Sequence, residues 1–186
     1  MNKIYYLFLA LLLLNCNESK TSRKTETKIE TYLKTTESKY QNYKTNSVVR
    51  DELNNFIKRD FKSQFNNSIL SDLPFQLDRV EKCENGKYIL SLEHSLTSKL
   101  EDEGMLSNLE IDLYCSIDEK KAKELTEGKF YLIDGKFNEY ITFQNNEKYC
   151  AYVLMSPFVG FTSELEGNEI QFGSIAFDLK SIKEIQ

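Results

Sequence analysis

Few side chains in this 186-residue sequence could carry covalent, metal or acid–base chemistry. They are four cysteines and a single histidine: Cys16, Cys83, Cys115, Cys150 and His94. One imidazole is too few for zinc sites that use two or three histidines. The sequence also contains no glycine-rich phosphate loop, GxSxG elbow or HExxH helix. We therefore predict no catalytic residues, no metal and no cofactor, and a function other than enzymatic catalysis.

Cys16 follows an unbroken apolar run of eleven residues, Ile4 to Leu14. A membrane-spanning helix needs about 20 residues, so the run is too short to cross a bilayer. With Lys3 before it, the run has the form of a secretory signal. The segment Leu13-Leu14-Asn15-Cys16 resembles a bacterial lipoprotein signal, which implies cleavage before Cys16 and acylation of that residue, as in palmitate-bearing lipoproteins. An ordinary secretory signal or a buried N-terminal helix is the alternative.

That resemblance implies a protein of the bacterial cell envelope, lipid-anchored to the membrane with its domain extracytoplasmic. We expect the outer membrane rather than the inner one. Residues 1–15 are then the signal peptide. Residues 16–46 are rich in Thr, Lys, Glu and Ser and poor in apolar side chains, which predicts a lipidated flexible tether. A transient helix from Lys28 to Tyr43 is the competing interpretation.

We expect residues 47–186 to form a single folded domain. They hold sixteen Lys or Arg against twenty-five Asp or Glu, a net charge of −9. Between residues 47 and 66, apolar side chains recur every three or four positions, which predicts an amphipathic helix with Ser47 as its N-cap. We expect this helix to pack on the domain's own sheet, and a helix lying on the membrane is the alternative.

From residue 73 onward apolar and polar residues alternate, as in half-buried strands. Strands are predicted at residues 73–83, 88–94, 109–116, 129–137, 140–143, 149–155 and 170–180. Asn85-Gly86 predicts a hairpin turn between the first two strands, and Gly135 predicts a bulge. The segment Ser116-Ile117-Asp118-Glu119 has the pattern of a capping box, which predicts a short helix before the 129–137 strand.

These elements follow the order strand, strand, strand, short helix, strand, strand, which is the order of the OB-fold. The segment Glu110 to Phe137 resembles the tRNA-anti-like OB-fold family: a strand ending in Cys, a short helix, Leu-x-x-Gly, and a strand closing in x-x-Gly. The resemblance implies a mainly β (α+β) fold, with an OB-like five-stranded partly open barrel over residues 73–155. Helix 47–66 precedes it and an extra C-terminal strand at 170–180 follows. An unrelated mixed sheet packed by that helix is the alternative.

The other three cysteines would lie in an oxidising compartment, where pairing is expected. Cys115 faces inward by its phase in the alternation, and Cys150 belongs to a predicted strand that could close beside it. We therefore favour a Cys115–Cys150 disulfide over pairings with Cys83 in the hairpin region. Three reduced, buried thiols are the alternative. His94 is in phase with apolar positions, so we expect a hydrogen-bonded interior or rim histidine.

The outward positions of the 109–116 strand are Glu110, Asp112 and Tyr114, which we predict as an interaction face. Tyr114 could stack on a base, but the neighbouring carboxylates and the net charge of the domain would repel phosphates. We therefore predict attachment to the membrane through Cys16, a protein or glycan partner, and no nucleic acid. The predicted function is a binding or protein-interaction module with an unspecified ligand. The alternatives are an immunity or inhibitor lipoprotein that captures an extracytoplasmic protein, and a hydrolase with a hidden site.

Overall fold

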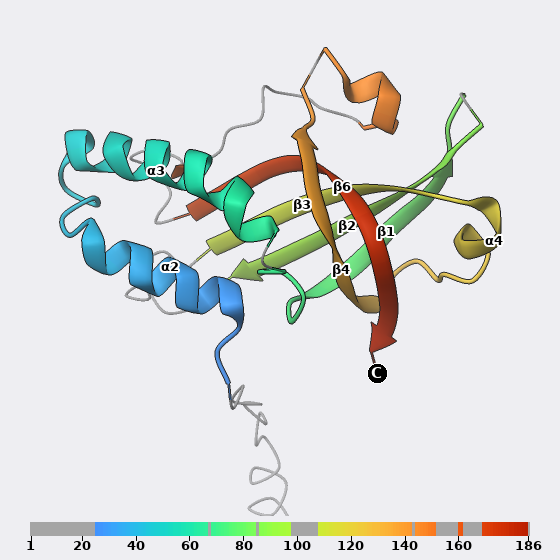
Figure 1. Ribbon diagram of the computed structural model, residues 1–186, viewed down its shortest axis with the longest axis horizontal. Helices are drawn as coiled ribbons and strands as arrows, with labels where there is room; N and C mark the ends of the chain where they lie inside the picture. Colours follow the sequence, from blue (N-terminus) through green and yellow to red (C-terminus); the bar gives the residue numbers. More distant parts are fainter. Residues whose placement is uncertain are drawn as a thin grey trace, which may run out of the picture.

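The computed structural model describes residues 25–66, 68–84, 86–97, 108–142, 144–151, 160–161 and 169–185. This part of the chain is mainly β, as predicted, and contains three α-helices (Figure 1). The expected signal peptide and Cys16 lie outside the described residues. Of the helices that the structure describes, none is both long enough and apolar enough to span a membrane.

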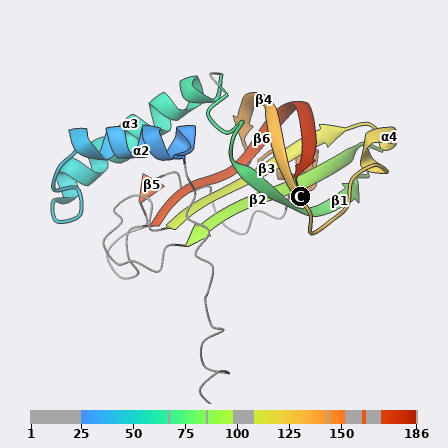
Figure 2. The same cartoon turned by 90° about the horizontal axis from the view of Figure 1, so that it is seen from below.

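Five strands close in a ring: β1 (Pro74–Lys82), β2 (Tyr88–Thr97), β3 (Asn108–Ile117), β4 (Phe130–Tyr140) and β6 (Glu169–Ile185). The two-residue strand β5 (Gly160–Phe161) pairs only with β6 and is not part of the ring. The strand order is β3-β2-β1-β4-β6-β5, and a further pairing of β3 with β6 completes the ring. The β3–β6 pair is parallel and the other neighbours are antiparallel. Figure 2 shows the curvature of these strands from below.

The strand that completes the ring differs from the one that the sequence predicted. In place of the strand expected at 149–155, residues Asn146–Tyr149 form the 3-10 turn η2, and residues 152–159 lie outside the described part. β6, expected only as an extra C-terminal strand, pairs with β4 along one part of its length and with β3 along another. Its 17 residues are long enough to satisfy the backbone groups of both neighbours. The predicted boundary of the β region at 155 is therefore wrong.

The predicted alternation within the strands is confirmed. Along β3 the inward side chains are Leu109, Ile111, Leu113 and Cys115, each at most 1% exposed. The β1–β2 hairpin is present, with Gly86 in the left-handed conformation that this turn needs (φ 78°). Gly135 lies at a register shift between β4 and β6, where a Cβ would collide with the carbonyl oxygen of Asp178. The ring therefore encloses a continuous apolar interior.

Helix α3 (Ser47–Phe65) confirms the predicted amphipathic helix and packs on the ring. Its buried side chains are Leu53, Ile57, Phe61 and Phe65, which recur at helical spacing. The ring of Phe61 stacks on Phe172 of β6 at 3.8 Å between centroids, and Phe65 lies within 6.0 Å of Phe177. These contacts fix α3 against the domain's own sheet, as expected.

Helix α2 (Lys28–Lys39) corrects the prediction of a flexible tether from residue 16 to residue 46. Ile29 and Leu33 have no exposed surface and belong to the main core. The ring of Tyr32 lies 6.2 Å from Phe61, so α2 packs beside α3, as Figure 1 shows. The Thr27 hydroxyl and the Glu30 carboxylate form a reciprocal capping box at its start. The sequence predicted this helix only as a transient alternative. Three of its residues are buried, and they are buried only because α3 covers them, so the sequence of α2 by itself gives little apolar signal.

Two helix caps lie one or two residues from their predicted positions. Asn46, not Ser47, caps α3, since its side-chain oxygen accepts hydrogen bonds from two backbone N–H groups in the first turn. Asp118, not Ser116, caps the short helix α4 (Glu119–Ala122) by accepting from the Lys121 N–H at 2.8 Å. Ser116 is still part of β3, so its side chain is not placed to cap the helix.

Candidate functional site: the outer face of the ring

Two rows of side chains cross the outside of strands β1, β2, β3 and β6. The strand register places Gln76, Glu93, Asp112 and Ser174 in one row, and Arg79, Ser91, Tyr114 and Ala176 in the next. We call these two rows the outer face. It contains Asp112 and Tyr114, two of the three residues predicted for interaction. The third, Glu110, lies on the same side of β3, opposite Ser95.

Asp112 is surrounded by other carboxylates. It lies directly opposite Glu93, and the charges of Glu110 and Asp78 also act on it. Burial in the first place, and then the negative charges of these three neighbours, raise the pKa of Asp112 from 3.8 to about 6. Like charges directly opposite each other destabilise a sheet. The outer face therefore carries an electrostatic cost that contact with cationic groups would relieve.

Tyr114 is partly covered and is not the open platform that the sequence suggested. Residues 141–151, which we call the covering segment, lie over the row that runs from Arg79 to Tyr114; residue 143 is not described. Arg79 donates from Nη2 to the carbonyl oxygen of Cys150 at 3.4 Å. Tyr114 packs against a small apolar cluster made up of Ile141, Tyr149, Ala151 and Ala176. The row that contains Asp112 carries no member of this cluster.

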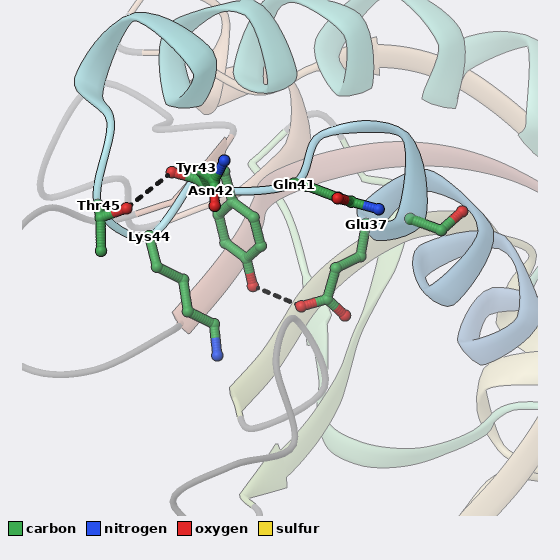
Figure 3. A pocket seen from close by; sticks show the side chains of 7 residues that line it. Glu37, Gln41, Asn42, Tyr43, Lys44 and Thr45 are labelled. Carbon is green, nitrogen blue, oxygen red and sulfur yellow. Dashed lines mark hydrogen bonds between the residues drawn. The ribbon is translucent and has the colours of Figure 1, made fainter.

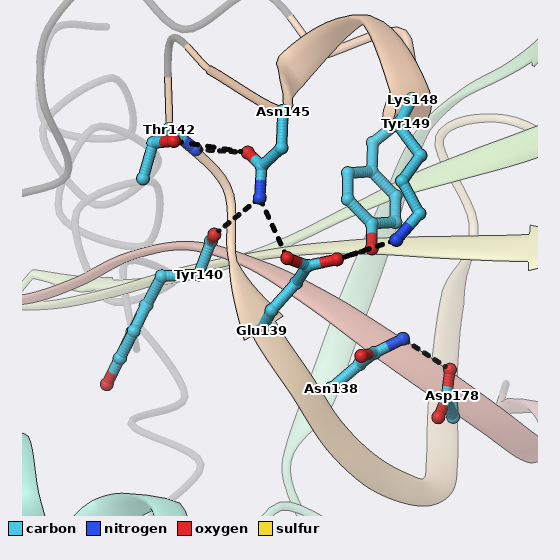
Figure 4. A network of polar contacts seen from close by, with 8 residues as sticks. All are labelled: Asn138, Glu139, Tyr140, Thr142, Asn145, Lys148, Tyr149 and Asp178. Carbon is cyan, nitrogen blue, oxygen red and sulfur yellow. Dashed lines mark hydrogen bonds and ion pairs between the residues drawn. The ribbon is translucent and has the colours of Figure 1, made fainter.

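Glu139 of β4 holds the covering segment in place (Figure 4). Its carboxylate accepts hydrogen bonds from the Tyr149 hydroxyl and, at 3.0 Å, from Asn145 Nδ2. It also forms an ion pair with Lys148, with 2.7 Å between Nζ and Oε1. Lys148 first, and then the Tyr149 hydroxyl, lower the pKa of Glu139 from 4.5 to about 2. The carboxylate is therefore ionised at neutral pH and can bind all three groups at once.

The disulfide joins Cys83 to Cys150, with 6.0 Å between the Cα atoms, and corrects the predicted Cys115–Cys150 pair. Cys115 is a free thiol, fully buried inside the ring as its phase predicted, and burial raises its pKa. The prediction failed because Cys150 ends the 3-10 turn on the outside of the ring rather than lying on a strand inside it. The bond connects the β1–β2 hairpin to the covering segment.

A groove of about 710 Å³ follows this disulfide. One wall belongs to the end of β1 and the other to the covering segment. The lining residues are Glu81, Lys82, Cys83, Glu84, Asn146, Glu147, Lys148, Cys150 and Ala151. Acidic and basic side chains both line the groove, so it has no clear preference for an anion or a cation. The groove also makes the disulfide accessible to molecules in solution.

His94 and Cys83 are not brought together. Cys83 follows the hairpin end of β1, whereas His94 is opposite Ile111, toward the other end of β2. The imidazole is 7% exposed, its Nδ1 is 2.7 Å from the Pro74 carbonyl oxygen, and the ring lies 5.8 Å from Phe75. His94 is therefore the hydrogen-bonded interior histidine that its phase predicted, and the described residues contain no Cys–His pair.

A second hollow of about 430 Å³ lies at the loop between α2 and α3 (Figure 3). Its lining residues come from one short stretch: Glu37, Ser38, Gln41, Asn42, Tyr43, Lys44 and Thr45. The Tyr43 hydroxyl donates to the Glu37 carboxylate at 2.9 Å, so these polar groups serve to close the loop. Within the described ranges, no group of three or more His, Cys, Asp or Glu side chains could hold a metal ion.

Comparison of the chain with protein-family models, with curated proteins and with solved structures gives no match. The resemblance of residues 110–137 to an OB-fold family is thus an expectation from sequence. Of the features described above, the outer face has the most distinctive chemistry, because it places two carboxylates directly opposite each other.

Proposed function

We propose that this chain is a lipid-anchored, extracytoplasmic binding module of OB-like architecture, and that its outer face binds a protein partner through basic side chains. The observation that carries the proposal is the direct opposition of Glu93 and Asp112 on the outer face. A partner that placed a Lys or Arg between these carboxylates would remove a repulsion already present in the free protein.

The order of the ring supports the OB-like assignment. An OB-fold is a five-stranded, partly open Greek-key barrel whose ligands bind on the face of strands 2 and 3, between the loops L12 and L45. Here β6 takes the place of the fifth strand, and α4 lies between β3 and β4. The loop after β1 corresponds to L12, and the covering segment after β4 corresponds to L45. The outer face thus coincides with the usual OB ligand face.

Charge selects the class of partner. Single-strand nucleic acid binding needs a basic groove. The two rows of the outer face instead contain Glu93 and Asp112 with one cation, Arg79, and the charges of Asp78 and Glu110 act on Asp112 from beside them. Arg79 is already engaged with the Cys150 carbonyl oxygen and with Glu81. Phosphates would meet repulsion here, so the proposal excludes nucleic acid and favours a basic protein over a neutral glycan.

The lipid anchor rests on the sequence around Cys16, which lies outside the described residues. Helix α2 docks on the domain, so the part of residues 16–46 that could act as a tether is shorter than the sequence suggested. The outer face would then be held close to the membrane surface, where partners in the same envelope compartment are found.

An immunity or inhibitor lipoprotein is a special case of the same proposal, in which the basic partner is a harmful extracytoplasmic protein. The acidic face favours it, because small acidic inhibitors use charge to speed association with basic targets. A hydrolase has less support. The two rows of the outer face offer carboxylates but neither a histidine nor a cysteine, and Cys83 is bonded to Cys150.

The test is co-purification of the tagged, full-length protein from membranes in mild detergent. The triple variant Glu93→Gln, Glu110→Gln, Asp112→Asn should lose a partner that the wild type retains. The matched control Asp51→Asn, Glu52→Gln, Glu124→Gln removes the same number of charges from exposed positions on α3 and after α4, and should retain it. Equal recovery by both triple variants would refute the proposed face.

A further inference from the structure

The Cys83–Cys150 disulfide connects two segments that lie 67 residues apart in the sequence and meet beside the outer face. Cys83 immediately follows β1, and Cys150 ends the covering segment's 3-10 turn. The bond therefore fixes the position of the covering segment over Tyr114. The disulfide therefore joins a hairpin to a segment that covers part of the outer face.

The covering segment has few other attachments in the described part of the chain. Its apolar contacts are the small cluster around Ala176, which is separate from the main core. At its start, the Ile141 N–H donates to the Ser174 carbonyl oxygen of β6 at 2.9 Å and Asn145 Nδ2 donates to the Tyr140 carbonyl oxygen. Beyond that start, its polar contacts to the ring are those with Glu139 and Arg79. Surface ion pairs of this kind contribute little to stability. Without the disulfide, these contacts alone would oppose release of the segment.

Cys150 caps the 3-10 turn of the covering segment. Its φ is 50° and its ψ is 30°, a left-handed conformation that is common at the end of a helical turn. Its N–H donates to the carbonyl oxygens of Asn146 and Glu147. These cap bonds lie within the covering segment, so they do not attach it to the ring.

Cys83 and Cys150 line a groove, and a reductant can approach the disulfide through it. Residue Cys83 is 6% exposed and residue Cys150 is more exposed, so we place the attack of an incoming thiolate at Cys150. The third cysteine, Cys115, is fully buried inside the ring and cannot exchange with this pair without unfolding of the domain. The geometry thus leaves two defined states, bonded and open.

We propose that Cys83–Cys150 is a redox clip, which holds the covering segment over Tyr114 when oxidised and releases it when reduced by an extracytoplasmic protein dithiol of the thioredoxin type. A thiolate of the dithiol attacks the Cys150 sulfur, forms a mixed disulfide and releases Cys83 as a thiolate, which takes up a proton. The second thiol of the reductant then resolves the mixed disulfide. Two electrons pass to the Cys83–Cys150 pair, which becomes two thiols, and the reductant becomes a disulfide.

Release would uncover Tyr114 and Ala176 beside the carboxylates and so enlarge the outer face with an aromatic and an apolar side chain. Aromatic side chains are enriched among residues that dominate protein–protein binding energy. The clip would then switch the same face between a smaller acidic surface and a larger amphipathic one. This consequence for binding rests on the proposed function, whereas the release itself does not.

The test is hydrogen exchange measured by mass spectrometry on the full-length protein in detergent micelles, oxidised or reduced with thioredoxin and its reductase without denaturant. Iodoacetamide should then label Cys83 and Cys150 but not Cys115. The amides of Asn146, Cys150 and Ala151, which bond within the segment, should exchange at least about tenfold faster after reduction. Peptides from β2 and β3 should keep their oxidised rates. The Cys83→Ser, Cys150→Ser variant should match the reduced protein, and Cys115→Ala should match the oxidised one.

Three outcomes would overturn the clip. One is a pair that cannot be reduced without denaturant, and another is unchanged exchange at residues 144–151 after both cysteines are alkylated. The third is faster exchange throughout β2 and β3, which would make the bond a staple of the whole fold. No binding partner takes part in the measurement, so it is interpretable even if the proposed function fails.

Discussion

Glu93 of β2 and Asp112 of β3 lie directly opposite each other on the outer face of the strand ring. Neither carboxylate gains from the other, and the pKa of Asp112 is raised as a result of burial and of its acidic neighbours. A protein under selection for stability alone would place an opposite charge at one of the two positions. The pair is the reason we propose that a partner supplies a cation to this surface.

The pH dependence of stability should show the cost of Asp112. Its folded pKa of about 6 is above its ordinary value of 3.8, so the folded state holds the proton more tightly than the unfolded state. Below its ordinary pKa of 3.8, Asp112 is protonated and its stabilising effect on the folded state is fully present. As the pH rises through about 6, Asp112 ionises in the folded protein and this contribution to stability is lost. Asp112→Asn should accordingly raise the free energy of unfolding by about 1–3 kcal/mol near neutral pH, with no gain near the ordinary pKa.

Urea denaturation of wild type and variant across this pH range is the measurement. Glu124→Gln, an exposed change after α4, is the control and should alter stability equally at both ends of the range. An Asp112→Asn variant that loses stability at neutral pH would show that the carboxylate has a stabilising contact, and would contradict the electrostatic cost inferred for this position.

Helix α2 should contribute to the stability of the domain. Leu33 has no exposed surface, so Leu33→Ala should lower the free energy of unfolding by about 2–5 kcal/mol. Thr35→Ala, two positions away on the exposed side of the same helix, should change it by no more than about 0.5 kcal/mol. If both variants had the wild-type denaturation midpoint, residues 28–39 would be the tether that the sequence suggested.

Glu139 should restrain the covering segment. Replacing it by Gln removes the ion pair with Lys148 and weakens the acceptor for Tyr149, so hydrogen exchange over residues 144–151 should become roughly two- to fivefold faster. Glu147→Gln changes a carboxylate on the same turn that takes no part in the Glu139 network and should have no such effect. Equal exchange in the wild type and in both variants would show that the disulfide and the apolar cluster suffice to hold the segment.

The outer face should not bind nucleic acid. In a fluorescence-anisotropy titration of the full-length protein at low salt, short single-stranded DNA and RNA should give a flat response, because the carboxylates around Tyr114 oppose phosphate contacts. Binding at micromolar or lower concentrations would contradict the charge argument. In that case Tyr114→Ala would be the first variant to examine, since an aromatic platform would then account for the affinity.

Local sequence patterns predicted most of the individual elements. Asn85-Gly86 located the β1–β2 hairpin, the alternation along β3 located its inward and outward side chains, and helical spacing located α3. Each of these signals lies within about 20 residues of sequence and depends on the same few contacts that form the element. The alternation along β3 was therefore enough to indicate that Glu110, Asp112 and Tyr114 point outward.

What depends on distant contacts was missed. Ile29 and Leu33 are too few to mark α2 as a packed helix, and they are buried only because α3 lies beside them. The parallel pairing of β3 with β6, and the opposition of Glu93 and Asp112, follow from the strand register, which the sequence does not display. Cys150 was assigned to a strand, and the wrong element led to the wrong disulfide partner.

Binding of a protein partner to the outer face can be measured by site-specific photo-crosslinking in living cells. Ser95 is exposed, lies opposite Glu110, and can be replaced by p-benzoylphenylalanine without removing any carboxylate. Val48 on α3 is 65% exposed and serves as the control position. We predict a discrete protein adduct from position 95 that disappears when Glu93→Gln and Asp112→Asn are added, and no such adduct from position 48. An adduct from position 48 alone, or one from position 95 that survives the loss of both carboxylates, would contradict binding at the outer face.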